Sequence, residues 1–125
     1  MEALLKYNFM YIYVYDYEGE WKMNVHVTNI YGFSPTSVVL ISQHEVRNIA
    51  RTLGFNELAV YIYDSSNEPM NELSSRYDGI IARVSPGDVV FFQSPTWNGV
   101  DWDNGLVDKL KAYGCRVVMF IQDVQ

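Results

Sequence analysis

Residues 87–99, G-D-V-V-F-F-Q-S-P-T-W-N-G, combine the pattern of a buried strand with a polar loop. Val89 to Phe92 form a continuous apolar run, which is typical of a strand that is buried on both faces of a parallel sheet. A polar and aromatic loop, Gln93 to Gly99, follows this run directly. The stretch therefore predicts a central strand with a candidate ligand-binding loop at its carboxyl end.

The same succession of strand and helix continues on both sides of this stretch. Short apolar runs predict further strands at residues 25–30, 58–63 and 117–121. Apolar residues at three- and four-residue spacings predict helices carrying Val39 to Leu53, Leu73 to Val84 and Leu106 to Tyr113. Strands and helices thus alternate along the chain with short connections.

Several residue types mark the expected ends of these helices. We expect N-caps from Ser34 for the first helix, from Asn71 for the second and from Asp101 or Asp103 for the third. Gly54 followed by Phe55 predicts a Schellman motif at the end of the first helix, and Gly114 is expected to end the third.

Alternating strands and helices imply right-handed crossovers, so the fold class is α/β, a Rossmann-like parallel sheet with helices on both faces. Ligands bind outside the carboxyl ends of the strands in such sheets. We therefore expect function to collect in the segments that follow the strands, namely residues 29–34, 64–66, 93–98 and 122–123.

Residues 23–125 account for the whole α/β pattern and are expected to form one domain. Residues 1–22 are an aromatic extension with tyrosines at alternate positions from Tyr11 to Tyr17. This alternation predicts an additional edge strand or an oligomer contact. The alternative is that Met23 is the natural start of the protein.

Composition excludes some classes of partner. The formal net charge of −6 opposes nucleic-acid binding, because the affinity for phosphate backbones comes from Lys and Arg. No run of 18 apolar residues and no signal-type N-terminus occur, so we expect a cytoplasmic protein without a membrane span. The single cysteine, Cys115, is expected to be a buried thiol in a reducing compartment.

Trp97 stands among Gln93, Thr96 and Asn98, a mixture suited to sugars. Sugar hydroxyls need hydrogen-bond donors and acceptors, and the apolar faces of sugars stack on aromatic rings. The alternative is that Ser94 to Thr96 build a plain turn while Trp97 covers the core.

Three acidic positions admit both a functional and a structural interpretation. Asp101 and Asp103 have the D-x-D spacing of a metal and nucleotide-diphosphate site, but helix capping is the favoured interpretation. Asp123 follows the last strand, where it would be a general base for a sugar hydroxyl or would only bond to turn amides.

The histidines and the missing motifs point to no cofactor. We expect His26 to be a buried, hydrogen-bonded imidazole and His44 to be solvated. The sequence lacks G-x-G-x-x-G, the P-loop motif, the G-x-S-x-G elbow and a Cys/His pair with metal spacing. Neither a bound cofactor nor a metal site is predicted.

Five segments together resemble a known family. They are V-T-N-I-Y-G-F-S (27–34), L-G-F-N-E-L (53–58), L-S-S-R-Y-D-G-I-I-A (73–82), G-D-V-V-F-F-Q-S-P-T-W-N-G (87–99) and V-M-F-I-Q-D-V (118–124). The chain resembles the bacterial two-domain GT-B sugar transferases, which include the glucosyltransferase of serine-rich adhesin glycosylation and related galactofuranosyltransferases. The resemblance covers residues 23–125.

This resemblance implies that the chain is the N-terminal, acceptor-binding half of a GT-B glycosyltransferase. The full protein would move glucose or a related hexose from a UDP-sugar to a glycan acceptor such as N-acetylglucosamine on a serine-rich glycoprotein. UDP-galactofuranose is the alternative donor. The donor domain would follow Gln125, so the fragment alone is expected to be inactive, and the full protein is expected to be a homo-oligomer.

Positions carried over from the family predict the residues that line the cleft. They are Asn29, Gly32 and Ser34 in one loop and Gln93, Thr96, Trp97 and Asn98 in another, with Asp123 as the base. Family members commonly have His before that aspartate, whereas Gln122 cannot titrate. The competing hypothesis is a non-catalytic interaction subunit or an inactive truncated fragment.

Overall fold

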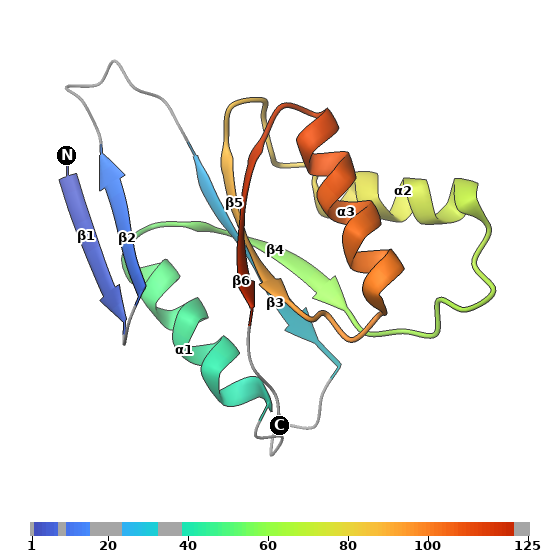
Figure 1. The fold of residues 1–125 in the computed structure, drawn as a ribbon, viewed down its shortest axis with the longest axis horizontal. Coiled ribbons are helices and arrows are strands. Elements are labelled where there is room, and N and C mark those ends of the chain that lie inside the picture. The colour runs from blue at the N-terminus through green and yellow to red at the C-terminus, as the bar shows by residue number, and fades with distance from the viewer. Residues whose placement is uncertain (1, 8–9, 16–23, 33–38, 122–125) are drawn as a thin grey trace.

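The computed structural model describes residues 2–7, 10–15, 24–32 and 39–121, with side chains for residues 24–32 and 44–121. Its centre is a four-stranded parallel sheet in the order β4-β3-β5-β6 (Figure 1). The strands are β3 (Val25–Tyr31), β4 (Asn56–Tyr61), β5 (Val89–Ser94) and β6 (Arg116–Ile121). The predicted parallel sheet is confirmed.

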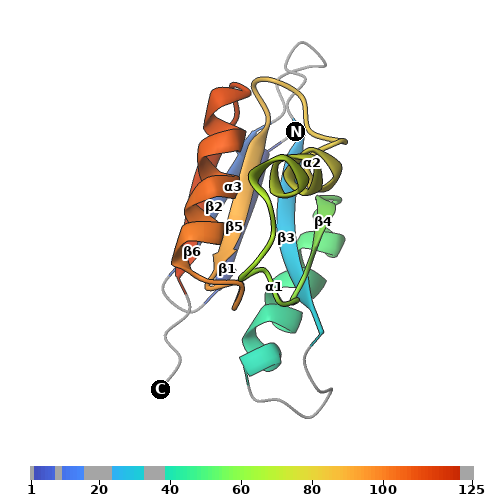
Figure 2. The same ribbon diagram turned by 90° about the vertical axis from the view of Figure 1, so that its right-hand side faces the viewer.

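Helices cover both faces of this sheet. α1 (Val39–Thr52) lies on one face, and α2 (Met70–Ile80) and α3 (Val100–Ala112) lie on the other (Figures 1 and 2). β4 lies on one side of β3, whereas β5 and β6 lie on its other side. The chain therefore crosses the sheet in two opposite directions. Because each crossover is right-handed, the helices lie on opposite faces. The Rossmann-like fold class is thereby confirmed, with its switch point between β3 and β5.

The larger core lies between the sheet and α2 and α3. Val60, Val90 and Phe92 of the sheet meet Leu106 and Leu110 of α3, and all five are fully buried. Each side chain of this size contributes roughly 1.5–3 kcal/mol when it leaves water. The sequence pattern of α3 therefore predicted Leu106 and Leu110 correctly, whereas Tyr113, expected on the same face, is 47% exposed.

Glycine ends two of the helices as predicted. Gly54 has φ +77°, and the amides of Gly54 and Phe55 donate to the carbonyls of Arg51 and Ala50, which is a Schellman motif. Gly114 and Cys115 repeat the pattern by donating to Lys111 and Leu110 after α3. These bonds satisfy carbonyls that the helix ends would otherwise leave without partners.

The predicted N-caps of α2 and α3 are wrong. Pro69 and Gly99 occupy these positions without a side-chain cap, and Asn71 lies inside α2. Asp101 and Asp103 lie in the first turn of α3, where Asp103 bonds to Thr96 instead of to its own helix. Ser34 lies outside the described residues.

Element boundaries also differ from the prediction. β4 spans Asn56–Tyr61 instead of residues 58–63. α2 ends at Ile80 instead of continuing to Val84, since a turn follows at once. β5 continues through Gln93 and Ser94, which pair with Phe120 and Ile121 of β6. Gln93 is polar but fully buried, and its hydrogen bonds to β3 allow the strand to extend beyond the apolar run.

The N-terminal extension forms an antiparallel pair of strands, β1 (Glu2–Tyr7) and β2 (Met10–Tyr15). The two strands form a separate two-stranded sheet and do not extend the parallel one. Backbone groups along one edge of β2 pair with β1, from Tyr15 with Glu2 to Met10 with Tyr7. Tyr17 lies outside the described residues.

Within the described part of the chain, no helix has the length and apolar character that crossing a membrane requires.

Candidate functional site

The carboxyl edge of the sheet, next to the switch point between β3 and β5, is the candidate site. The structure places six of the predicted residues there, on two strands and the loops that follow them: Asn29, Gly32, Gln93, Thr96, Trp97 and Asn98. The other two predicted residues, Ser34 and Asp123, and the neighbouring Gln122 lie outside the described residues.

Strands β3 and β5 separate towards this edge. Their direct pairing ends at Val27 and Phe91. Beyond that point the backbone amide of Gln93 donates to Thr28 Oγ1 at 2.8 Å, and Gln93 Nε2 donates to the Thr28 carbonyl at 2.6 Å. Side-chain bonds thus connect the two strands where their backbone ladder ends.

Asn29 and Gln93 are bonded neighbours at this edge. Gln93 Nε2 also donates to Asn29 Oδ1 at 3.4 Å, while Asn29 Nδ2 has no hydrogen-bond partner. Only 3% of Asn29 and none of Gln93 is exposed. Both side chains therefore lie beneath the surface of the candidate site.

Gly32 is required by a close approach of two strand ends. Its φ of +112° suits glycine, and a Cβ atom there would lie 3.3 Å from the Cβ of Ile62. The Ile62 amide donates to the Tyr31 carbonyl at 2.9 Å, which continues the β3–β4 ladder beyond the strands. This packing explains Gly32 without a ligand.

The loop after β5 is fixed on one side by Asp103. The backbone amide of Thr96 donates to Asp103 Oδ2 at 3.1 Å, and the Thr96 hydroxyl donates to Asp103 Oδ1. Both residues are buried. Burial raises the pKa of Asp103 above its usual range, although the two bonds from Thr96 act in the opposite direction.

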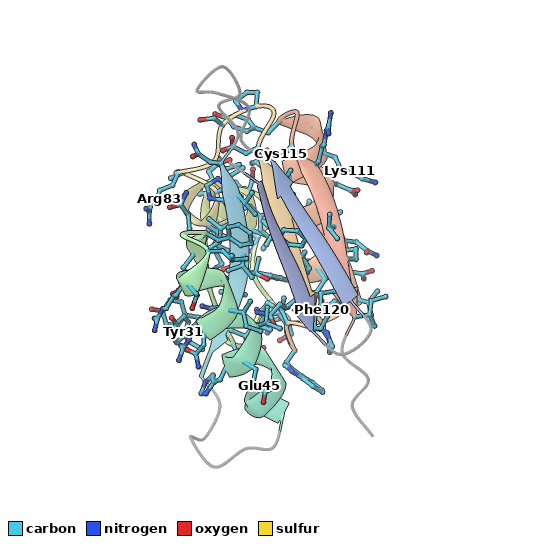
Figure 3. All side chains as sticks on the ribbon, turned by 90° about the vertical axis from the view of Figure 1, so that its left-hand side faces the viewer. Tyr31, Glu45, Arg83, Lys111, Cys115 and Phe120 are labelled. Atoms are coloured by element: carbon cyan, nitrogen blue, oxygen red, sulfur yellow. The ribbon has the colours of Figure 1, made fainter. Side chains whose placement is uncertain are left out.

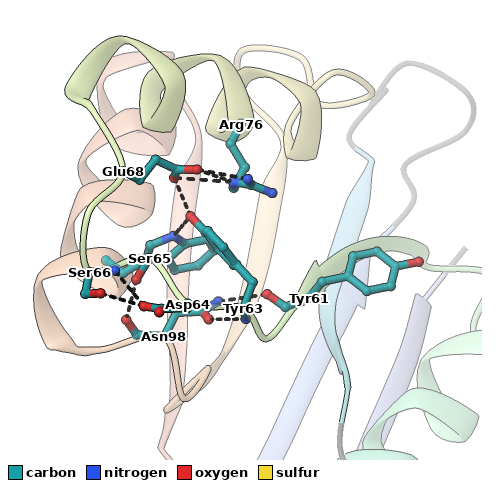
Figure 4. A network of polar contacts seen from close by, with 9 residues as sticks. Tyr61, Tyr63, Asp64, Ser65, Ser66, Glu68, Arg76 and Asn98 are labelled. Carbon is teal, nitrogen blue, oxygen red and sulfur yellow. Dashed lines mark hydrogen bonds and ion pairs between the residues drawn. The ribbon is translucent and has the colours of Figure 1, made fainter.

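The same loop is fixed on its other side by Asn98, as Figure 4 shows. Asn98 Oδ1 accepts the amide of Tyr63 at 3.1 Å, and Asn98 Nδ2 donates to the carbonyl of Tyr61 at 2.9 Å. Ser65 Oγ adds a bond of 3.3 Å to the Asn98 carbonyl. The amide side chain pairs with β4 as a neighbouring strand would, and so fastens the loop to the sheet.

Trp97 stands between these two fixed points. Its φ of +71° lies in the left-handed region, which costs a bulky residue roughly 1–3 kcal/mol. The residue is 41% exposed, whereas Trp102 is only 4% exposed. Trp102 is therefore the tryptophan that packs in the core, whereas Trp97 lies at the surface of this edge.

A second polar network lies beside the candidate site, and no local sequence pattern predicts it. Tyr63 OH accepts a bond of 2.9 Å from Trp102 Nε1 and donates to Glu68 (Figure 4). Arg76 binds both oxygens of Glu68 and lies 3.9 Å over the Tyr63 ring. The bonds from Arg76 lower the pKa of Glu68, and the bond from Tyr63 lowers it further. This network fastens the loop between β4 and α2.

The metal interpretation of the D-x-D spacing has no support. Asp101 is exposed, whereas Asp103 is buried and bonded to Thr96 through both oxygens. Among the residues that the structure describes, no group of three or more His, Cys, Asp or Glu side chains could hold a metal ion. The two aspartates have separate environments and do not form a pair.

His26 belongs to the opposite edge of the sheet. Its Nε2 lies 2.8 Å from Asp88 Oδ2, and both side chains are buried, as expected. Nδ1 has no hydrogen-bond partner, so the imidazole is only half satisfied. Cys115, also buried as expected, lies at this edge as well, far from Tyr31 (Figure 3). His44 is exposed, as predicted.

Comparison with known proteins places this geometry in a family. Residues 24–125 match the family described as Glucosyltransferase 3-like, N-terminal domain. Glucosyltransferase 3 of Streptococcus gordonii is 49% identical over 102 residues, which are 82% of this chain and 30% of the relative. Glucosyltransferase 3 of Streptococcus parasanguinis is 45% identical over 102 residues, 82% of this chain and 31% of the relative.

The chain spans less than a third of the length of either relative. The matched segment includes β3 to β6 and the helices between them, and thus the whole candidate site. The chain belongs to the Glucosyltransferase 3-like family, of which it is an N-terminal domain.

Proposed function

We propose that this domain binds the acceptor sugar in a glycosyltransferase, and that Trp97 is its stacking platform. The observation that carries the proposal is the exposed indole of Trp97, held in a left-handed backbone conformation between two fixed residues. Strained residues that their surroundings hold in place cluster at functional sites. Indole rings suit the apolar face of a pyranose.

The surroundings of Trp97 suit a neutral, hydroxyl-rich ligand. Ser94 and Asn98 are partly exposed neighbours in the same loop, and the loop after β4 adds Ser65 and Ser66. Such side chains offer both donors and acceptors to sugar hydroxyls. The net charge of −6 favours a neutral acceptor over an anionic one at this edge.

We propose further that the complete enzyme transfers glucose or a related hexose from a UDP-sugar, with UDP-galactofuranose as the alternative donor. The names of the two streptococcal relatives support a glucosyl donor. A glycan acceptor, such as N-acetylglucosamine on a serine-rich glycoprotein, follows from the family resemblance. The same resemblance supports a homo-oligomeric, cytoplasmic enzyme whose donor site lies in another domain.

Asp123 remains our proposal for the general base. It follows β6, as the Trp97 loop follows β5, so the parallel sheet brings the ends of both strands to the same edge. A carboxylate within hydrogen-bonding reach of an acceptor hydroxyl would remove its proton during attack on the donor.

A titration of the chain with N-acetylglucosamine tests the acceptor proposal. We expect the Trp97 indole NMR signal to shift in a saturable way at millimolar sugar, while the signal of buried Trp102 stays in place. Equal shifts of both signals would indicate a general solvent effect. No shift of the Trp97 signal at any saccharide concentration would contradict the proposal.

A further inference from the structure

We infer that Asp103 is a positioning residue, which holds Trp97 in its exposed left-handed conformation by fixing Thr96. The inference deepens the acceptor-binding function proposed above, because it names what keeps the platform in place. Asp103 itself is buried and is not expected to touch the sugar.

Among the described residues, the side-chain hydrogen bonds of Asp103 all go to Thr96. Both oxygens accept from Thr96, one from the backbone amide and one from the hydroxyl. It caps no backbone amide of its own helix, and no basic side chain of the described residues pairs with it. Its bonds therefore act entirely on the residue that precedes Trp97.

Burial of a carboxylate at this position has a cost in folding stability. It raises the pKa of Asp103 above its usual range, because burial disfavours the charged form. The two bonds from Thr96 act against this cost, and they fix Thr96 in place.

Trp97 directly follows Thr96. Its left-handed conformation persists only where the surrounding structure holds it. Asn98 is held by β4 through two side-chain bonds, and Thr96 is held by Asp103. The Asn98 amide also lies 3.4 Å from Thr96 Oγ1, so the two fixed points are connected around Trp97. Loss of Asp103 releases one of them.

Three variants of the chain test the inference by NMR. Asp103→Ala removes both bonds to Thr96. Asp103→Asn retains the shape and both contacts, since its Oδ1 accepts the Thr96 amide while its Nδ2 donates to the Thr96 hydroxyl. Asp101→Ala is the matched control, because Asp101 lies in the same helical turn but is exposed.

We expect Asp103→Ala to shift and broaden the backbone and indole signals of Trp97, while the Trp102 indole, bonded to Tyr63, keeps its position. N-acetylglucosamine affinity should fall by roughly tenfold, about the worth of a lost aromatic contact. Asp103→Asn should restore both readouts to within about threefold. Asp101→Ala should match the parent chain.

The inference is overturned if the Trp97 signals of Asp103→Ala superimpose on those of the parent chain. This holds at any saccharide affinity of the variant. Failure of Asp103→Asn to rescue Trp97 would overturn it as well. If Asp103→Ala loses the Trp102 signal and so fails to fold, Thr96→Val takes its place: it removes the hydroxyl bond to Asp103 and the 3.4 Å bond from the Asn98 amide but keeps the bond from the Thr96 amide, and unchanged Trp97 signals in it would overturn the inference. An absent saccharide response in the parent chain contradicts the acceptor proposal alone, since the Trp97 signals report its conformation without ligand.

Discussion

At Trp97, the backbone conformation and the side chain make separate contributions that substitution can distinguish. A Cβ atom makes the left-handed conformation costly, whereas glycine adopts it freely. The indole, in turn, supplies the surface on which a sugar would stack. Stability and binding should therefore respond differently to Trp97→Gly and Trp97→Ala.

We predict that both variants lose measurable N-acetylglucosamine binding, and that Trp97→Gly is more stable than Trp97→Ala by about 1 kcal/mol. Urea denaturation of the two variants gives the difference in stability, and NMR titration gives the binding. Equal stability would show that Trp97 is not held in the left-handed region, while retained binding would remove the indole from the site.

Asp88 connects stability to pH at the amino edge of the sheet. Burial raises its pKa most strongly, but bonds from His26 and from the amides of Ser85 and Asn24 outweigh burial and leave the pKa lowered. A carboxylate with a lowered folded-state pKa stabilises the fold above its unfolded pKa. This contribution is lost as the pH falls through the folded value.

We therefore predict that the free energy of unfolding falls as the pH drops below about 4, and that Asp88→Asn reduces this dependence. At pH 7 the substitution should cost roughly 1–3 kcal/mol, because buried donors lose a charged acceptor. Urea titrations from neutral to acidic pH measure both effects. A parallel acid dependence in the variant would exclude Asp88 as its source.

At the residue scale, the Trp97 loop can be predicted as a candidate site from residue types, but the bonds that hold it cannot. Residue types alone single out Trp97, since an aromatic ring among polar neighbours after a buried strand suits sugar binding. Capping statistics assigned Asp103 to its own helix, whereas tertiary structure turned it to Thr96. Asn98 bonds to residues more than 30 positions away, a contact that no local pattern encodes.

At the scale of elements, two helical glycines have opposite surroundings. Gly79 of α2 has open space around its Cα, whereas a Cβ at Gly105 of α3 would lie 2.5 Å from the hydroxyl of Tyr77. That hydroxyl donates to the Trp102 carbonyl at 2.7 Å, which joins α2 to α3. Gly105 thus permits close packing of the helices, while Gly79 only weakens α2.

We predict that Gly79→Ala stabilises the protein by about 0.5–1 kcal/mol, the gain in helix propensity. Gly105→Ala should destabilise it by about 1–3 kcal/mol, since the methyl group displaces Tyr77. Thermal unfolding of the two variants, side by side, measures both changes. Stabilisation by Gly105→Ala would contradict the described contact between α2 and α3.

Element types were predictable because periodicity and glycine stops act locally. Gly54 with Phe55 marked the end of α1 correctly, and the apolar runs located β3 to β6. The starts of α2 and α3 were not predictable, because Pro69 and Gly99 begin these helices without the side-chain bond that the rule assumes.

At the scale of the whole molecule, the strand order determines where the site lies. Alternating strands and helices predicted a parallel sheet, but not that β3 lies between β4 and β5. That order follows from long-range packing, and it places the switch point beside the Trp97 loop. The position of the loop could therefore be confirmed only in three dimensions.

We propose that this domain supplies the acceptor site of a sugar transferase. The chain covers about a third of the length of its relatives, so a test of sugar transfer requires the remaining part of the enzyme. In a suitable chimera, residues 24–125 of this chain replace the matching 102 residues of the Streptococcus gordonii relative. Three variants of this chimera are compared with it: Trp97→Ala, Asp123→Asn and, as the control, Asp101→Ala.

The most direct measurement is hexose transfer by this chimera from several UDP-sugars to a peptide that carries N-acetylglucosamine. We predict transfer by the chimera and by Asp101→Ala, a raised acceptor KM in Trp97→Ala, and a rate lower by roughly 10²- to 10⁴-fold in Asp123→Asn. A folded chimera without transfer would contradict the account, as would an acceptor KM that does not respond to the loss of Trp97.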